Sequence, residues 1–201
     1  MKKVGIYSGT FDPVHEGHVA FAREALVQCG LDKVFFLVEP RPRRKQGVKA
    51  FTHRVEMVHL AIQDEQQFGV IIADEKRFTA QETLPRLQHR FEGAELYMLM
   101  GDDMLDHFDS WPHVELLMQE IHFAIGLRTY DRKTVKQRLE LIQEIRATRM
   151  QYQLFQASQP KFASTTIRLA LKAGEVPRGI SPVVLDYIKT NGLYASSNDG
   201  S

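Results

Sequence analysis

The sequence predicts a single α/β domain built on a Rossmann-like, doubly wound parallel sheet with helices at its C-terminal end. Short apolar runs alternate with helical patterns along most of the chain, which is typical of repeated βα units with strands buried on both faces. The length of 201 residues suits one domain with a sizeable core. No internal repeat or change in composition marks a second domain.

Each expected strand is a short run rich in apolar and aromatic residues. In chain order, the strands are expected at 4–8, 33–39, 70–73, 95–100, 121–127 and 151–157. Each expected helix has apolar residues at helical spacing, the fourth being weak and the fifth highly charged. The helices are expected at 17–28, 52–64, 80–91, 114–118, 131–150, 164–172 and 182–190. Right-handed crossovers would bring the loops after the strands to one ligand crevice.

Composition excludes several classes of function. The 26 basic and 25 acidic residues nearly balance, which argues against a nucleic-acid-binding protein. The single Cys29 excludes an internal disulfide framework and fits a reducing cytoplasm. We expect a cytoplasmic protein without a membrane segment, because the apolar runs are only as long as strands. The sequence is equally compatible with one chain or a homo-oligomer. The domain is expected to span 1–194, with a disordered polar tail at 195–201.

The most informative segment is 9–18, which connects the first expected strand to the first helix. A helix N-terminus offers unpaired N–H groups to a phosphate, and Gly9 and Gly17 would let ligand oxygens approach the backbone. His15 and His18 are three residues apart, so their rings should share one face of the first turn. Two imidazoles placed in this way could each donate a hydrogen bond to one phosphoryl group.

A second segment, 162–168, combines a helix start with a cation. Ser164 and Thr165 could cap the helix, and its exposed N–H groups could hold a terminal phosphate. Arg168 lies one turn further, where its guanidinium could bridge phosphate oxygens. Taken alone, a capped helix start of this kind is more often structural.

Both segments resemble the nucleotidyltransferases with a His-x-Gly-His signature, specifically the bacterial nicotinate mononucleotide adenylyltransferases. The first segment reads Gly-Thr-Phe-Asp-Pro-Val-His-Glu-Gly-His, and the second matches the family's Ile-Ser-Ser-Thr-x-Ile-Arg at Ser164, Thr165, Ile167 and Arg168. The helix at 52–64 matches the family's Arg-x-x-Met-x-x-x-Ala at Arg54, Met57 and Ala61. The resemblance covers nearly the whole chain.

The resemblance implies transfer of AMP from ATP to nicotinate mononucleotide, with Mg²⁺ carried by ATP and no metal site of the protein's own. The implied catalytic residues are His15, His18 and Arg168. The implied ATP-binding residues are Gly9, Thr10, Phe11, His15, Gly17, His18, Gly101, Asp103, Ser164, Thr165 and Arg168. The implied acceptor-binding residues are Arg44, Lys45, Phe78, Thr79, Trp111 and Arg128, with Trp111 stacking on the nicotinate ring.

Some of these residues also have purely structural interpretations. Thr79 and Glu82 could form a capping box at an ordinary helix start, and both readings can hold together. Asp102 and Asp103 could cap the next short helix, and the basic loop 40–46 could be a solvated loop.

The chain departs from the family at Ala163, in the basic loop and after Arg128. Another acceptor, such as nicotinamide mononucleotide or phosphopantetheine, and a nucleotide-binding regulator without catalysis therefore stay open. An aminoacyl-tRNA synthetase fragment fits less well, because the chain is short and has no anticodon module.

Overall fold

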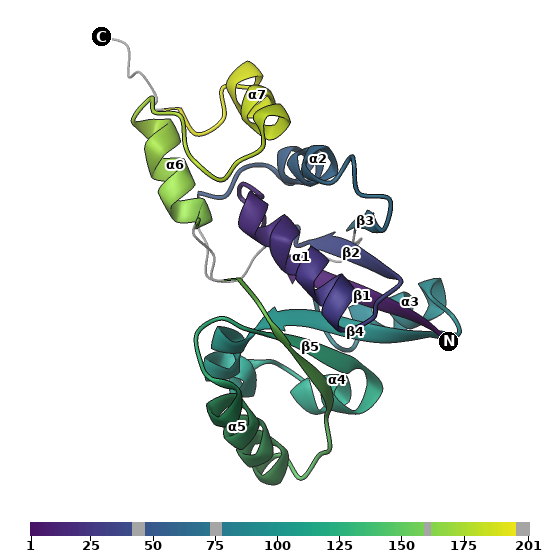
Figure 1. The fold of residues 1–201 in the computed structure, drawn as a ribbon. Helices are drawn as coiled ribbons and strands as arrows, with labels where there is room; N and C mark the ends of the chain where they lie inside the picture. The colour runs from purple at the N-terminus through teal and green to yellow at the C-terminus, as the bar shows by residue number, and fades with distance from the viewer. Residues whose placement is uncertain (42–46, 73–77, 159–161, 196–201) are drawn as a thin grey trace.

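The computed structural model describes residues 1–41, 47–72, 78–158 and 162–195. Six parallel strands and the helices around them form one domain (Figure 1), as the sequence predicts. The strands are β1 (Lys2–Gly9), β2 (Lys33–Val38), β3 (Phe68–Ile72), β4 (Ala94–Gly101), β5 (His122–Leu127) and β6 (Gln151–Gln156). The helices are α1 (Glu16–Gln28), α2 (Phe51–Ala61), α3 (Thr83–Arg90), the 3₁₀ helix η1 (Asp102–Ser110), α4 (Val114–Glu120), α5 (Arg132–Ile145), α6 (Ser164–Lys172) and α7 (Pro182–Thr190).

The order of strands across the sheet fixes where a ligand can bind. The order is β3-β2-β1-β4-β5-β6, and every neighbouring pair is parallel. The chain winds outward from β1 in one direction and from β4 in the other, so these two central strands lie at the switch point. Their carboxyl ends therefore open the crevice in which doubly wound sheets bind ligands.

Two hydrophobic cores cover the two faces of the sheet. Alternate strand residues point to opposite faces, so Tyr97 and Leu99 of β4 contact one core, whereas Met98 and Met100 contact the other. The first core is closed by α1, α2, α6 and α7, and the second by α3, η1, α4 and α5. In Figure 1, α7 lies beside α2, far along the chain from it, and the two helices are in contact.

Three predicted helices differ from the observed ones by three or more residues at one end. The helix predicted at 131–150 ends at Ile145, because Ala147 takes a left-handed φ of 46° and the Thr148 amide donates to the Gln143 carbonyl, a pattern that terminates helices. The helix predicted at 52–64 ends at Ala61. The helix predicted at 80–91 begins only at Thr83, because residues 80–82 form a turn.

Parts of several sequence predictions fall outside the described residues. Ala73, the last residue of the predicted third strand, is one of these, and almost all of the tail predicted at 195–201 lies beyond the last described residue. Within the described part of the chain, no helix is both long enough and apolar enough to span a bilayer.

Candidate active site

A cavity of about 1210 Å³ lies at the carboxyl ends of β1 and β4. Its wall combines the loops after β1, β4 and β5 with the first turns of α1 and α6. It brings together all the described residues that the sequence analysis assigned to ATP or to the acceptor. These are Gly9, Thr10, Phe11, His15, Gly17, His18, Phe78, Thr79, Gly101, Asp103, Trp111, Arg128, Ser164, Thr165 and Arg168. Arg44 and Lys45, also assigned to the acceptor, lie outside the described residues.

The two histidines stack on each other at the start of α1. Their ring centroids are 3.7 Å apart with an interplanar angle of 29°, so the predicted shared face is observed. The His15 backbone amide donates to Nδ1 of His18 over 3.2 Å. Because Nδ1 of His18 accepts this bond, the neutral ring carries its proton on Nε2 and that nitrogen acts only as a donor.

His15 is buried, with 7% of its surface exposed. Burial, with a smaller effect of the Arg128 charge, lowers the pKa of His15 from 6.5 to about 4. The ring is therefore neutral near pH 7 and can offer a phosphate a hydrogen bond without a net charge. Its Nδ1 atom is buried and has no hydrogen-bond partner.

Gly9 makes room for a neighbouring side chain of the chain itself. A Cβ atom at this position would lie 2.7 Å from the Phe11 ring. Phe11 is buried and packs edge-on against both Tyr7 and His18. From the sequence, the missing Cβ of Gly9 was expected to allow close approach by a ligand. In the structure it lets Phe11 support the His18 ring.

The start of α6 lies close to the loop after β1, but its side chains do not cap it as predicted. Ala163 is the N-cap residue, and no side chain caps this helix. The Ser164 hydroxyl instead donates to the Pro13 carbonyl over 3.0 Å. Arg168 donates to the Asp12 carbonyl over 2.7 Å and to the Thr165 hydroxyl over 3.2 Å. The first turn of α6 is thereby tied to the segment that carries the histidines.

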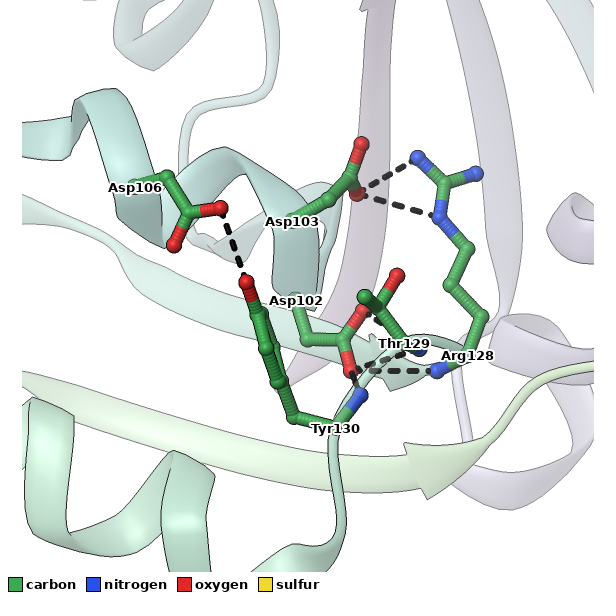
Figure 2. Close-up of polar contacts among 6 residues, drawn as sticks. All are labelled: Asp102, Asp103, Asp106, Arg128, Thr129 and Tyr130. Atoms are coloured by element: carbon green, nitrogen blue, oxygen red, sulfur yellow. Dashed lines mark hydrogen bonds and ion pairs between the residues drawn. The ribbon is translucent and has the colours of Figure 1, made fainter.

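Two adjacent carboxylates after β4 have different tasks, as Figure 2 shows. Asp102 is fully buried and accepts hydrogen bonds from the backbone amides of Arg128, Thr129 and Tyr130. Asp103 faces the cavity and accepts from Nε and Nη2 of Arg128 at 3.0 and 2.6 Å. The structural interpretation of Asp102 as an exposed cap is therefore wrong. Asp102 holds the loop after β5 in place, and Asp103 holds the Arg128 guanidinium.

Gly101, which precedes these two carboxylates, allows them to approach Arg128. A Cβ atom there would overlap both the Asp103 carboxylate and the Arg128 guanidinium. The glycine is required by this close approach, which brings the carboxyl ends of β4 and β5 together.

The remaining wall carries Phe78, Thr79 and Trp111. The Thr79 hydroxyl accepts from the Glu82 amide over 3.1 Å, and the Thr79 amide donates to the Thr83 hydroxyl over 3.0 Å. The predicted capping box of Thr79 and Glu82 is therefore wrong: the Thr79 amide bonds to Thr83 and not to Glu82, and both bonds belong to the turn before α3. Trp111 follows η1, is half-buried, and lies 5.3 Å from the Phe108 ring.

The comparisons with known proteins agree with this geometry. The sequence model of the cytidylyltransferase-like family matches residues 6–170. A probable nicotinate-nucleotide adenylyltransferase of Neisseria gonorrhoeae is 34% identical, with 96% of this chain and 99% of the relative covered. The nicotinate-nucleotide adenylyltransferase of Bacillus subtilis is 33% identical, with 98% and 100% covered. The chain belongs to the nicotinate-nucleotide adenylyltransferase family.

A solved structure supports the fold independently. The nicotinic acid mononucleotide adenylyltransferase of Plasmodium falciparum, complexed with NaAD, superposes with a TM-score of 0.75 at 20% identity. The alignment covers 96% of this chain and 98% of that one. At this identity the comparison establishes a shared architecture.

In this member of the family, sequence reasoning missed the task of Arg54. It was noted as matching a family motif, but no contact was assigned to it. The residue is 1% exposed, and its guanidinium donates to four backbone carbonyls, those of Thr10, Glu39, Pro40 and Lys49. Arg54 thus joins the loops after β1 and β2 to the start of α2. The sequence did offer one signal for this role: Arg54 lies on the same face of the predicted helix as apolar residues, where a charged side chain is unusual unless it is paired.

The cavity wall also contains polar side chains that no motif singled out. Ser8, Glu39, His107 and Thr129 are among them. Ser8 donates to Glu39 over 3.3 Å, which links the ends of β1 and β2. These residues come from four separate segments, so their common location depends on the sheet order.

Proposed function

We propose that this chain transfers the adenylyl group of ATP to nicotinate mononucleotide, yielding the dinucleotide and pyrophosphate. The observation that carries the proposal is the stacked His15–His18 pair, located in the same cavity as the first turn of α6 and Arg168. Relatives of matching length bear the corresponding name.

The reaction is an in-line displacement at the α-phosphorus of ATP. A phosphate oxygen of the acceptor forms the new P–O bond, and the bond to the β-phosphate bridge oxygen breaks, so the electron pair leaves with pyrophosphate. The nucleophile is already ionised near pH 7 and needs no general base. The protein therefore contributes positioning and stabilisation of developing charge.

His18 and His15 are assigned to the oxygens of the reacting phosphates. The Nδ1 atom of His18 is engaged by the His15 amide, which orients its Nε2–H as a fixed donor. His15 is neutral because of its lowered pKa, so it adds a second donor without repelling nearby cations. Fixed donors of this kind stabilise a transition state without reorganising.

Arg168 and the start of α6 are assigned to the leaving pyrophosphate. Arg168 is tied to the Asp12 carbonyl and to Thr165, which limits the directions that its guanidinium can take. The N–H groups of the first turn of α6 are not capped by a side chain, so they can donate to phosphate oxygens. Ser164 and Thr165 carry the hydroxyls at this position.

The opposite part of the cavity is assigned to the acceptor and the ribose groups. The resemblance puts Gly101 and Asp103 at the nucleotide, Trp111 on the nicotinate ring, and Phe78 and Thr79 at its carboxylate. Arg128 is assigned to a phosphate of the acceptor. This phosphate would compete with Asp103 for the Arg128 guanidinium. Arg44 and Lys45 remain predictions from the sequence.

Magnesium is assigned to the substrate. Among the residues that the structure describes, no group of three His, Cys, Asp or Glu side chains is arranged to hold a metal ion. Mg²⁺ bound to nucleotides commonly keeps phosphate and water ligands. It would enter here with ATP and neutralise part of the triphosphate charge.

Pyrophosphate release from ATP and Mg²⁺, measured with each candidate acceptor in turn, tests the proposal. We expect release with nicotinate mononucleotide and far less with nicotinamide mononucleotide or phosphopantetheine. If pyrophosphate is released only with nicotinamide mononucleotide, or only with phosphopantetheine, that compound is the acceptor. Binding of ATP without release for any acceptor would favour a regulator.

The His18→Ala variant tests the assigned chemistry in the same assay. We expect turnover to fall by about 100-fold or more, as for removal of one preorganised donor. A thermal melt checks that the variant is folded. Turnover close to that of the unaltered chain would remove His18 from the mechanism.

A further inference from the structure

Asp12 lies at the centre of a buried network beside the proposed pyrophosphate site. Its side chain is 6% exposed. One carboxylate oxygen, Oδ1, accepts from the Tyr194 hydroxyl over 2.5 Å and from the Lys49 amide over 3.2 Å. The other, Oδ2, lies 4.0 Å from Nη1 of Arg168, and the Asp12 carbonyl accepts from that same nitrogen over 2.7 Å. Asp12 therefore contacts Arg168 through both its backbone and its side chain.

Tyr194 reaches this network from the other end of the chain. It follows α7, takes a left-handed φ of 62°, and is only 7% exposed. Lys49 Nζ lies 5.4 Å from its ring centroid. Burial and the Asp12 carboxylate both raise the pKa of Tyr194, so its hydroxyl keeps its proton at neutral pH and remains a donor.

Other contacts tie the same C-terminal segment to the histidine turn. The Ser164 hydroxyl donates to the Pro13 carbonyl, and the Glu16 amide donates to the Gly179 carbonyl over 2.8 Å. These bonds hold the start of α6 and the loop after it beside the segment 9–18, and in both the acceptor is a backbone carbonyl. The Tyr194–Asp12 bond differs from them, because it fixes the side chain that lies next to the Arg168 guanidinium.

We propose that Tyr194 is a positioning residue for the triphosphate, acting through Asp12 on Arg168. The Tyr194 hydroxyl fixes the rotamer of the Asp12 carboxylate, and the fixed carboxylate and carbonyl direct the guanidinium into the cavity. The inference deepens the proposed function, because it rests on Arg168 holding the β- and γ-phosphates. Without the hydroxyl, Asp12 loses a donor and Arg168 samples more orientations.

The test compares binding of ATP and of AMP to the full chain by titration calorimetry. For Tyr194→Phe we expect the dissociation constant for Mg²⁺–ATP to rise by about fivefold to tenfold, as for the loss of one hydrogen bond to a charged group. The dissociation constant for AMP should stay within about twofold, because AMP has no β- or γ-phosphate for Arg168 to hold.

Tyr187→Phe is the matched control. The Tyr187 hydroxyl bonds to Nδ1 of His53 over 2.8 Å and belongs to the same C-terminal segment, but it does not contact Asp12. This variant removes the same atom from a neighbouring tyrosine and should leave both affinities unchanged. An equal loss of ATP and AMP affinity in Tyr194→Phe would overturn the inference, since a general loosening of the fold would act on both ligands.

A double-mutant cycle with Arg168→Lys tests the route of the effect. If Tyr194 acts through Arg168, adding Tyr194→Phe to Arg168→Lys should weaken ATP binding by less than twofold. Additive losses would overturn the inference.

Asp12→Asn provides a second variant should Tyr194→Phe fail to fold. It keeps an oxygen for Tyr194 but removes the charge beside Arg168, so we expect the same selective loss for ATP. Loss of AMP binding in equal measure would contradict the proposed route. All these measurements use binding alone, so they remain decisive even if nicotinate mononucleotide proves not to be the acceptor.

Discussion

The two stacked imidazoles have different surroundings although they are only three residues apart. His15 is the N-cap residue of α1 and is buried, whereas His18 accepts a backbone hydrogen bond on Nδ1. Burial keeps the first ring neutral, and the hydrogen bond fixes the tautomer of the second. Spacing predicted the shared face, but the surroundings that set protonation depend on the β1–α1 turn as folded.

The lowered pKa of His15 predicts a pH-dependent contribution to stability. Its pKa is about 4 in the folded chain and 6.5 ordinarily, so between these values the unfolded chain binds the proton more readily. The contribution of the neutral ring is complete above the unfolded pKa and is lost as the pH falls through this window. The positive charge of Arg128, which follows β5, also opposes protonation of His15, and the His18 ring is stacked against the His15 ring.

The comparison of the unaltered chain with His15→Gln by urea unfolding at pH 7 and pH 5 measures this contribution. The free energy of unfolding of the unaltered chain exceeds that of the variant by an amount that should shrink by about 2 kcal/mol between pH 7 and pH 5. The reason is that pH 5 lies about 1.5 units below the ordinary pKa of histidine, and each unit corresponds to about 1.4 kcal/mol. An advantage that is the same at both pH values would mean that His15 protonates normally in the folded state.

At the scale of the elements, η1 is held by contacts with residues far along the chain. It is tied to the segment after β5 by the bonds that Asp102 accepts from three amides. On its outer side, Asp106 accepts from the Tyr130 hydroxyl over 2.9 Å and also pairs with Arg138 of α5. Figure 2 shows the Asp102 and Asp106 side chains directed toward this segment. The arrangement positions Asp103 and Trp111 in the cavity wall.

Asp102→Ala should destabilise the protein more than Asp106→Ala. The first substitution removes a fully buried carboxylate that accepts from three backbone amides, which costs about 3 kcal/mol of unfolding free energy. Asp106 is partly exposed, with 38% of its side-chain surface accessible, so water can replace its partners and the loss should be small. Urea unfolding of both variants measures the difference, and similar losses would refute the structural task given to Asp102.

At the scale of the whole molecule, Arg54 connects the segments that surround the switch point of the sheet. Its four carbonyl acceptors belong to the loops after β1 and β2 and to the residues before α2. Desolvation lowers its pKa, while Asp12, Tyr194 and Glu39 act in the opposite direction. A charged group so deeply buried is tolerated because its donors are satisfied by backbone oxygens.

Arg54→Met should lower the free energy of unfolding by about 3 to 5 kcal/mol, because several buried carbonyls lose their donor. Arg54→Lys should recover only part of the loss, since one ammonium cannot reach carbonyls in different directions. Arg23→Met is the matched control, because Arg23 pairs with Glu65 at the surface and is 57% exposed. Equal losses in Arg54→Met and Arg23→Met, measured by urea unfolding, would contradict the assignment.

The sequence by itself determined the fold class and the segments that carry the chemistry. Apolar runs and helical spacing are local properties, so they predicted the parallel sheet and the bounds of α6 and α7. Local prediction was wrong where a turn replaced the first or last turn of a helix, as at Thr79 and Ala147. There, hydrogen bonds within a few residues competed with helical ones, and the helical pattern does not reveal which set prevails.

Only the tertiary structure decided which backbone atoms and distant side chains meet. Asp12 and Tyr194 are 182 residues apart. The partners of Asp102 are backbone amides, which every residue type except proline offers, and those of Arg54 are backbone carbonyls, which every residue type offers. The Ser164 hydroxyl likewise bonds to a carbonyl and does not cap its own helix. The residue types in the sequence do not reveal such partners, because a backbone group becomes a hydrogen-bond partner only when the sheet order and the helix packing bring it within reach.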